Sequence, residues 1–145
     1  METQPIKFRF TGIQLLSKEM RSLVAEPLTA EMFNYNIRVE TRVQAKTKSV
    51  LIFVFVNISD NKENYLAKIE AVCVFEIEKF DEVLKLNENN LYDVPGELND
   101  TIRPVSISTV RGIVYSEFRG TPLHNAIMPV VYLKDFVEQT IEKRS

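Results

Sequence analysis

The chain has 145 residues, of which 18 are Lys or Arg and 20 are Asp or Glu, so its formal net charge is −2 at pH 7. This balance excludes the bulk attraction to nucleic acid that a strongly basic domain has, and the length predicts a single domain over residues 1–145. One cysteine, Cys73, and one histidine, His124, exclude an internal disulfide and any metal site that needs several of either residue.

The first residues show no signal-peptide pattern, and the longest apolar run, Val50 to Val56, is far shorter than the roughly 20 residues of a membrane span. We therefore expect a cytoplasmic domain with no membrane insertion. The first strand is predicted at 6–10, where apolar and charged residues alternate. Apolar residues then move from even to odd positions, which predicts a bulge at Gly12. Residues 17–31 are interpreted as a connection.

Three more strands follow. In 33–45 one face carries the side chains of Phe33, Tyr35, Ile37, Val39, Thr41, Val43 and Ala45, and the other face is polar. The segment 49–58 is almost continuously apolar, so both of its faces need cover. The segment 65–77 alternates, and its second face is apolar in the middle and acidic at its ends.

Residues 79–103 are expected to form a long crossover. A short helix is possible within 79–86, and the run 87–90 together with Pro95-Gly96 is interpreted as breaking regular structure. From Pro104 the apolar period becomes helical, with Pro104 in the first turn and Gly120 after the last. A last amphipathic helix is predicted at 131–143.

This order predicts an α+β fold: a four-stranded antiparallel meander sheet, a crossover loop and two C-terminal helices on one face. Two short helices cannot cover both apolar faces of the central strands. A partner subunit or a ligand must therefore cover the second face, and we expect a homo-oligomer.

The sequence contains little catalytic chemistry, and we predict no catalytic residues, no metal site and no cofactor. His124 can act as a general base, but no nucleophile motif accompanies it. Cys73 is mid-strand and is interpreted as a core residue. No glycine-rich loop precedes a helix, so a phosphate-binding motif is missing. Carboxylates gather around the end of the fourth strand, including Glu76 and Glu78, and are interpreted as an acidic strip able to dock a basic partner.

The helical half has a more specific pattern. Arg119-Gly120-Thr121, a loop with Pro122 and Asn125, and Pro129-Val130 resemble the C-terminal half of the SecB protein-export chaperones. The stretch from Phe8 to Leu15 also resembles that family's first strand. The resemblance implies an ATP-independent chaperone, a holdase for unfolded preproteins, which acts in protein transport as a homotetramer, without cofactor. It implies a client-binding groove along the crossover and helices, formed here by Leu84, Leu86, Leu91, Tyr92, Val94, Leu123 and Met128.

The sequence departs from this family at its motor-binding surfaces. SecB proteins dock the translocase motor SecA through acidic residues after the first strand, where this chain has Ser17 and Arg21. Only the strand-four group, Glu76 and Glu78, is kept. We therefore expect weak SecA docking. Some SecB-like proteins serve an antitoxin of a toxin–antitoxin system, and this use fits the departures equally. Two other readings stay open: a small enzyme with His124 as base beside Glu117 or Asn125, and an oligomeric scaffold without clients.

Overall fold

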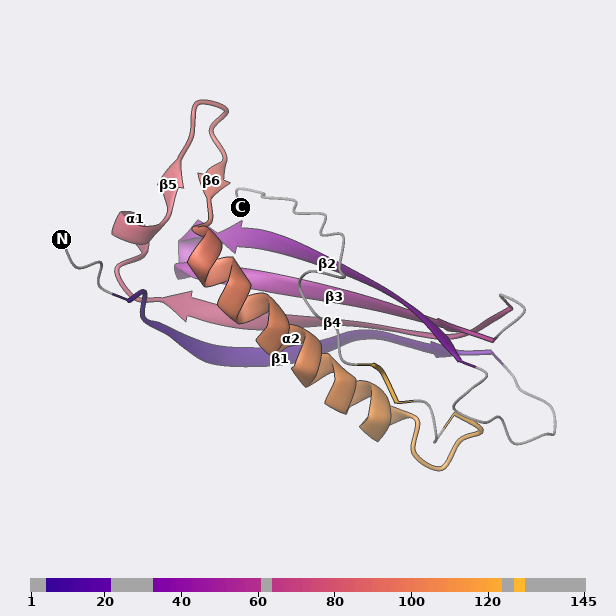
Figure 1. The fold of residues 1–145 in the computed structure, drawn as a ribbon. Helices are drawn as coiled ribbons and strands as arrows, with labels where there is room; N and C mark the ends of the chain where they lie inside the picture. Colours follow the sequence, from indigo (N-terminus) through magenta and orange to yellow (C-terminus); the bar gives the residue numbers. More distant parts are fainter. Residues whose placement is uncertain (1–4, 22–32, 61–63, 124–126, 130–145) are drawn as a thin grey trace.

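The computed structural model describes residues 5–21, 33–60, 64–123 and 127–129. In this part of the chain the main sheet consists of the antiparallel strands β1 (Phe8–Met20), β2 (Asn34–Gln44), β3 (Ser49–Ser59) and β4 (Tyr65–Ile77). The other elements are η2 (Ala45–Thr47), α1 (Phe80–Val83), β5 (Lys85–Leu86), β6 (Tyr92–Asp93) and α2 (Gly96–Glu117). Helix α2 crosses one face of the sheet diagonally (Figure 1). The predicted α+β class and the antiparallel sheet are therefore confirmed.

The strand order is β1-β4-β3-β2, so the expected meander holds for β2, β3 and β4 but not for β1. Two hairpins join these three strands and leave β4 with one free edge. Strand β1 pairs along that edge, from Phe8 opposite Ile77 to Met20 opposite Ala67. The rings of Phe8 and Phe10 lie 5.8 and 4.6 Å from the Phe75 ring, centroid to centroid. Aromatic packing on β4 therefore accompanies this non-sequential pairing.

Strand β1 contains the predicted irregularity, because its register shifts between Phe10 and Gly12. A second shift, between Leu15 and Ser17, was not predicted. The strand also continues to Met20, so the prediction that a connection starts at residue 17 was wrong. The last residues of β1 are mostly polar because they lie at an exposed edge of the sheet, where charged side chains form ion pairs. Glu19, for example, pairs with Lys68 at 3.4 Å.

The core lies between the sheet and α2. The apolar faces predicted for β2, β3 and β4 are buried, and α2 supplies apolar side chains to the same cluster. The members of this core from the three strands and the helix include Val39, Val43, Val50, Ile52, Val54, Val56, Ile58, Ile69, Ala71, Phe75, Ile77, Leu98, Ile102, Val110 and Val114. Alternation along the strands thus positioned the core correctly.

Helix α2 begins at Gly96, two turns before the predicted start, so Pro104 lies inside it rather than in its first turn. Proline removes one helical hydrogen bond, the one that would reach the carbonyl of Asp100. Asp100 is exposed, so water can satisfy that carbonyl. Leu98 and Ile102 are buried, and their packing holds the early turns that the sequence pattern missed.

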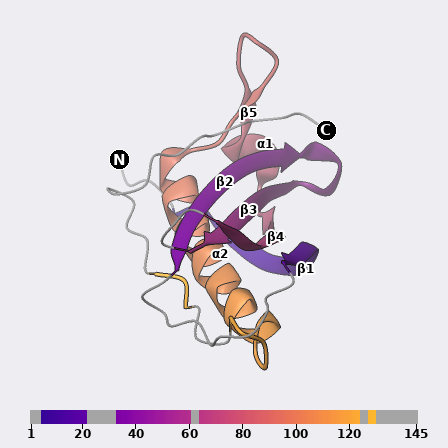
Figure 2. The same cartoon turned by 90° about the vertical axis from the view of Figure 1, so that its right-hand side faces the viewer.

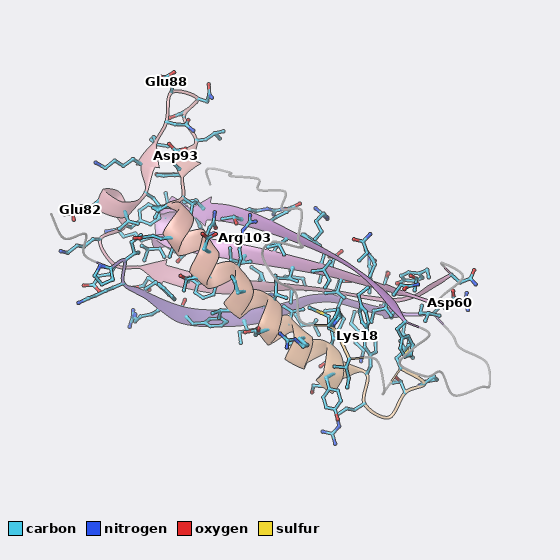
Figure 3. All side chains as sticks on the ribbon, in the orientation of Figure 1. Lys18, Asp60, Glu82, Glu88, Asp93 and Arg103 are labelled. Atoms are coloured by element: carbon cyan, nitrogen blue, oxygen red, sulfur yellow. The ribbon has the colours of Figure 1, made fainter. Side chains whose placement is uncertain are left out.

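A polar junction also holds the first half of α2. Arg103 is fully buried and donates from Nε and a terminal nitrogen to Oγ1 of Thr41 on β2, at 2.9 and 2.8 Å. Thr41 Oγ1 in turn lies 3.2 Å from Oδ1 of Asn99. Arg103 lies between the helix and the sheet (Figure 3). Because these groups are buried, each strongly favours one placement of α2 on β2.

At its other end α2 stops as predicted, with Gly120 in the left-handed region at φ 77°. Lys18 of β1 donates to the carbonyl of Glu117 at 3.0 Å, and it lies beside the end of α2 (Figure 3). A cation at this place stabilises the C-terminal end of the helix, where the last carbonyls carry partial negative charge. The short helix expected within 79–86 is α1. The helix predicted at 131–143 lies outside the described residues.

Candidate functional site

The crossover forms a hairpin that projects from one end of the molecule. Strands β5 and β6 pair, with Leu86 opposite Tyr92, and both views show the hairpin pointing away from the sheet and from α2 (Figures 1 and 2). Leu86 and Leu91 are 45% and 38% exposed. Two of the predicted groove residues are therefore apolar side chains at an exposed tip.

The base of the hairpin is packed against the body. The Tyr92 ring lies edge-on to Phe80 of α1, with centroids 5.6 Å apart. Tyr92 and Val94 are half-buried against the core, and Leu84 is buried within it. In this conformation Leu84 is a support for the hairpin rather than a surface residue.

Leu123 and Met128, the other two predicted groove residues, are buried beyond the C-terminal end of α2. The backbone N–H of Leu123 donates to Thr121 Oγ1 at 3.1 Å, and this hydroxyl donates to the Phe118 carbonyl at 2.7 Å. The 22 residues of α2 span about 33 Å at 1.5 Å per residue. The structure therefore does not gather the seven predicted residues into one surface.

A second exposed apolar surface lies on β1 and was not predicted from the sequence. Phe10, Ile13, Leu15, Leu16 and Met20 are 38–55% exposed on this edge strand. The available signal was the apolar alternation itself: a half-buried pattern needs cover, and an edge strand has a neighbour on one side only. These side chains, which we call the β1 apolar edge, are the largest exposed apolar group on one element of the described chain.

The sheet face away from α2 has a cover of its own. The guanidinium carbon of Arg38 lies 4.0 Å from the Phe55 ring centroid, and that of Arg42 lies 4.2 Å from the Phe53 centroid. Glu40 lies between the two arginines and accepts a hydrogen bond from each, at 2.7 Å from Arg42. The sequence predicted that a partner or a ligand covers this face. Side chains of the neighbouring strand supply part of that cover, over Phe53 and Phe55.

Glu40 is electrostatically tuned by this arrangement. Burial alone raises the pKa of its carboxyl, but the hydrogen bonds and charges of Arg42 and Arg38 outweigh burial, so the pKa lies below its usual 4.5. The carboxylate therefore stays ionised at neutral pH and keeps both guanidiniums over the rings.

The predicted acidic strip is partly neutralised. Glu76 pairs with Arg9 of β1 at 2.9 Å, and both side chains are well exposed. Glu78 is exposed, and its backbone N–H donates to the carbonyl of Lys7 at 3.0 Å. Glu76 therefore presents less negative charge to a basic partner than the sequence suggested, while Glu78 stays exposed.

The described residues offer no catalytic constellation. Cys73 is buried; burial raises the pKa of its thiol, while a hydrogen bond with Ser106 opposes that rise. His124 lies outside the described residues, as does Asn125. Within the part of the chain that is described, no group of three His, Cys, Asp or Glu side chains is placed to bind a metal ion. None of the helices described there is long and apolar enough to cross a membrane.

Comparisons with known proteins show which solved structures the fold is similar to. No protein-family model and no curated protein matches the chain. Its fold is similar to that of the Mycobacterium tuberculosis SecB-like chaperone Rv1957, solved in complex with a ChAD peptide from the HigA1 antitoxin. The two chains are 16% identical, and the likeness has a TM-score of 0.59 and covers 86% of this chain and 88% of the other. The chain therefore has a SecB-like fold.

Proposed function

We propose that this chain is an ATP-independent chaperone, a holdase that binds non-native polypeptide and carries out no chemistry. The observation that supports this most directly is the SecB-like fold shared with a chaperone over 86% of the chain. Exposed apolar side chains on the hairpin supply a surface that such binding needs.

The binding mode follows from these side chains. Apolar contacts are non-directional, so they suit clients of many sequences, and burying one large apolar side chain contributes roughly 1.5–3 kcal/mol. Leu86 and Leu91 lie on a projecting element, where an extended client segment can reach them. We propose that a client first contacts these two residues, and that Tyr92 and Val94, which are half-buried, lie beneath this contact.

The chain is further proposed to work in the cytoplasm as a homo-oligomer, most simply a homotetramer. The arginine cover reduces the need for a partner on the open face of the sheet. The β1 apolar edge creates a need elsewhere, because β1 offers exposed apolar residues and, among the described strands, pairs along one edge only. Pairing of this edge with a second copy satisfies both.

A dedicated client is the second candidate. The solved chaperone of similar fold holds a peptide of an antitoxin, so an antitoxin of a toxin–antitoxin system is a specific alternative to general preproteins. Delivery of clients to SecA is the less favoured route, because Arg9 neutralises Glu76 and Arg21 replaces negative charge after β1.

The test is suppression of aggregation. A holdase added without ATP at one oligomer per client should keep a chemically denatured test protein in solution on dilution, and it should bind reduced, carboxymethylated α-lactalbumin. A chain that does neither, yet binds an antitoxin, is a dedicated chaperone. A chain that binds no polypeptide at all contradicts the proposal and leaves the scaffold reading.

A further inference from the structure

We propose that Asn87 is a positioning residue: it holds the β5–β6 hairpin closed, and thereby presents Leu86 and Leu91 to a client in a fixed arrangement. This inference rests on the proposed function. It concerns a residue that the sequence pattern assigned only to a breaker-rich run, and it gives that residue a defined task.

The tip is organised almost entirely by Asn87. Its Oδ1 accepts hydrogen bonds from the backbone N–H of Asn89 at 2.8 Å and of Leu91 at 3.1 Å. Its Nδ2 donates to Oδ1 of Asp93, at 3.1 Å, across the hairpin. Its own backbone N–H donates to the Leu91 carbonyl at 2.7 Å, and its carbonyl accepts from Asn90 at 3.0 Å. The side chain therefore satisfies two loop amides and also links the two strands.

These bonds matter because little else closes the hairpin. Strands β5 and β6 are two residues each, and an isolated two-stranded hairpin is at best marginally stable in water. Asn90 adopts a left-handed φ of 63°, a conformation that asparagine tolerates better than most residues. The contact of Tyr92 with Phe80 fixes the base only, at a centroid distance of 5.6 Å. Beside two backbone bonds, the Asn87 side chain thus supplies the three hydrogen bonds that order the tip.

The link to binding is pre-organisation. Glu88 lies at the far end of the hairpin and Asp93 at its base (Figure 3), and Leu86 and Leu91 come directly before and after the loop that Asn87 closes. If the hairpin opens, these two leucines separate, and the apparent Kd for a client that needs both rises in inverse proportion to the closed fraction. Closing the hairpin before binding removes that ordering cost from the encounter.

The geometry allows a reciprocal exchange as the test. Asn87→Ala removes all three side-chain bonds. Asn87→Asp keeps the acceptor for the two amides but sets a second carboxylate against Asp93. The double variant Asn87→Asp with Asp93→Asn restores the link with its direction reversed, because the new amide donates to the new carboxylate. Asp93→Asn alone is the matched control, since its Oδ1 still accepts from Asn87.

Two readouts are measured on the full chain: binding of labelled, reduced and carboxymethylated α-lactalbumin by fluorescence anisotropy, and hydrogen exchange of residues 87–92. We expect Asn87→Ala and Asn87→Asp to raise Kd about fivefold to tenfold, because each loses at least the hydrogen bond to Asp93, and to speed exchange at the tip. The control and the double variant should match the parent in both readouts.

Each other outcome has a definite meaning. Faster exchange with unchanged client affinity shows that Asn87 shapes the hairpin but does not act in binding, and it overturns the proposal. Weak binding by the double variant despite restored protection overturns it as well. If the parent itself does not bind the probe, the proposed chaperone function fails. The hydrogen-exchange data then still show whether Asn87 orders the hairpin, so the two failures can be told apart.

Discussion

The guanidinium carbon of Arg42 on β2 lies 4.2 Å from the centroid of the Phe53 ring on β3, on the sheet face that α2 leaves open. Phe53 is stacked on Phe55 at a centroid distance of 6.4 Å, and Arg38 repeats the same arrangement over Phe55. Both arginines are held there by one buried carboxylate, Glu40. The two aromatic rings on this face are thus covered by the guanidinium groups of charged side chains.

Removal of this cover should destabilise the fold. We expect Arg42→Ala to lower the free energy of unfolding by about 1–2 kcal/mol, because Phe53 loses its cation–π partner and Glu40 loses a charge-assisted hydrogen bond. Urea unfolding measures the change. Arg9→Ala is the matched control, since the exposed pair of Arg9 with Glu76 should contribute about 0–1 kcal/mol. Equal effects of the two substitutions would contradict a stabilising role for the cover.

The stability should also depend on acid pH through Glu40. Its pKa in the folded chain lies below the 4.5 of an unperturbed carboxyl, so its contribution is complete above pH 4.5 and is lost as the pH falls through the lower, folded-state value. Glu40→Gln should therefore lower the free energy of unfolding at pH 6, and the difference in this free energy between variant and parent should be smaller at pH 3. Urea unfolding at both pH values checks this. A gap that widens toward pH 3 would reverse the assigned sign.

The β1 apolar edge should govern assembly. Ile13→Asp together with Leu15→Asp places two charges where we propose that copies of the chain meet, so the parent oligomer should fall to a mass near the 16.8 kDa of one chain. Light scattering at micromolar concentration measures the mass. Asn36→Asp, on the exposed face of the opposite edge strand, should leave it unchanged. A parent that is already monomeric would remove the proposed interface.

Charges on the hairpin should separate client contact from structural support. Leu86→Asp with Leu91→Asp should weaken binding of a denatured test protein at least tenfold while the free energy of unfolding changes little, because both side chains are exposed. Tyr92→Asp should instead lower stability, since Tyr92 packs on Phe80. Aggregation assays and urea unfolding give the two readouts. Full chaperone activity in the double variant would place the client site elsewhere.

Docking to a SecA motor should be weak and should respond to charge. Arg21 is exposed just after β1, and Arg9 neutralises Glu76. The double variant Arg9→Ala with Arg21→Glu should bind SecA about tenfold more tightly than the parent, because a repulsive charge is reversed and Glu76 is released. Ser17 is a poorer target, since it lies opposite Glu70 in the sheet. Tight calorimetric binding by the parent, unaffected by either change, would show that this surface is not the docking site.

Several features of the candidate site could not be predicted from the sequence, because they depend on contacts between different elements. The sequence pattern places Arg38 and Arg42 on the solvated face of a strand, and only the pairing of β2 with β3 sets them over aromatic rings. Asn87 was predicted only to interrupt regular structure, because the sequence pattern does not show which atoms its side-chain amide reaches across the hairpin. Leu123 and Met128, predicted as groove residues, are buried beyond α2, a placement that the sequence pattern does not show.

The sequence alone determined strands β2, β3 and β4, the irregularity at Gly12 and the faces that form the core, since each depends on the side-chain period of two or on one residue's conformational freedom. Only the tertiary structure decided that β1 pairs with β4, that α2 begins at Gly96, and that the arginines cover the open face. Those features depend on contacts between residues far apart in the chain, such as Arg103 with Thr41. A local period carries no information about such partners, so burial and pairing had to select them.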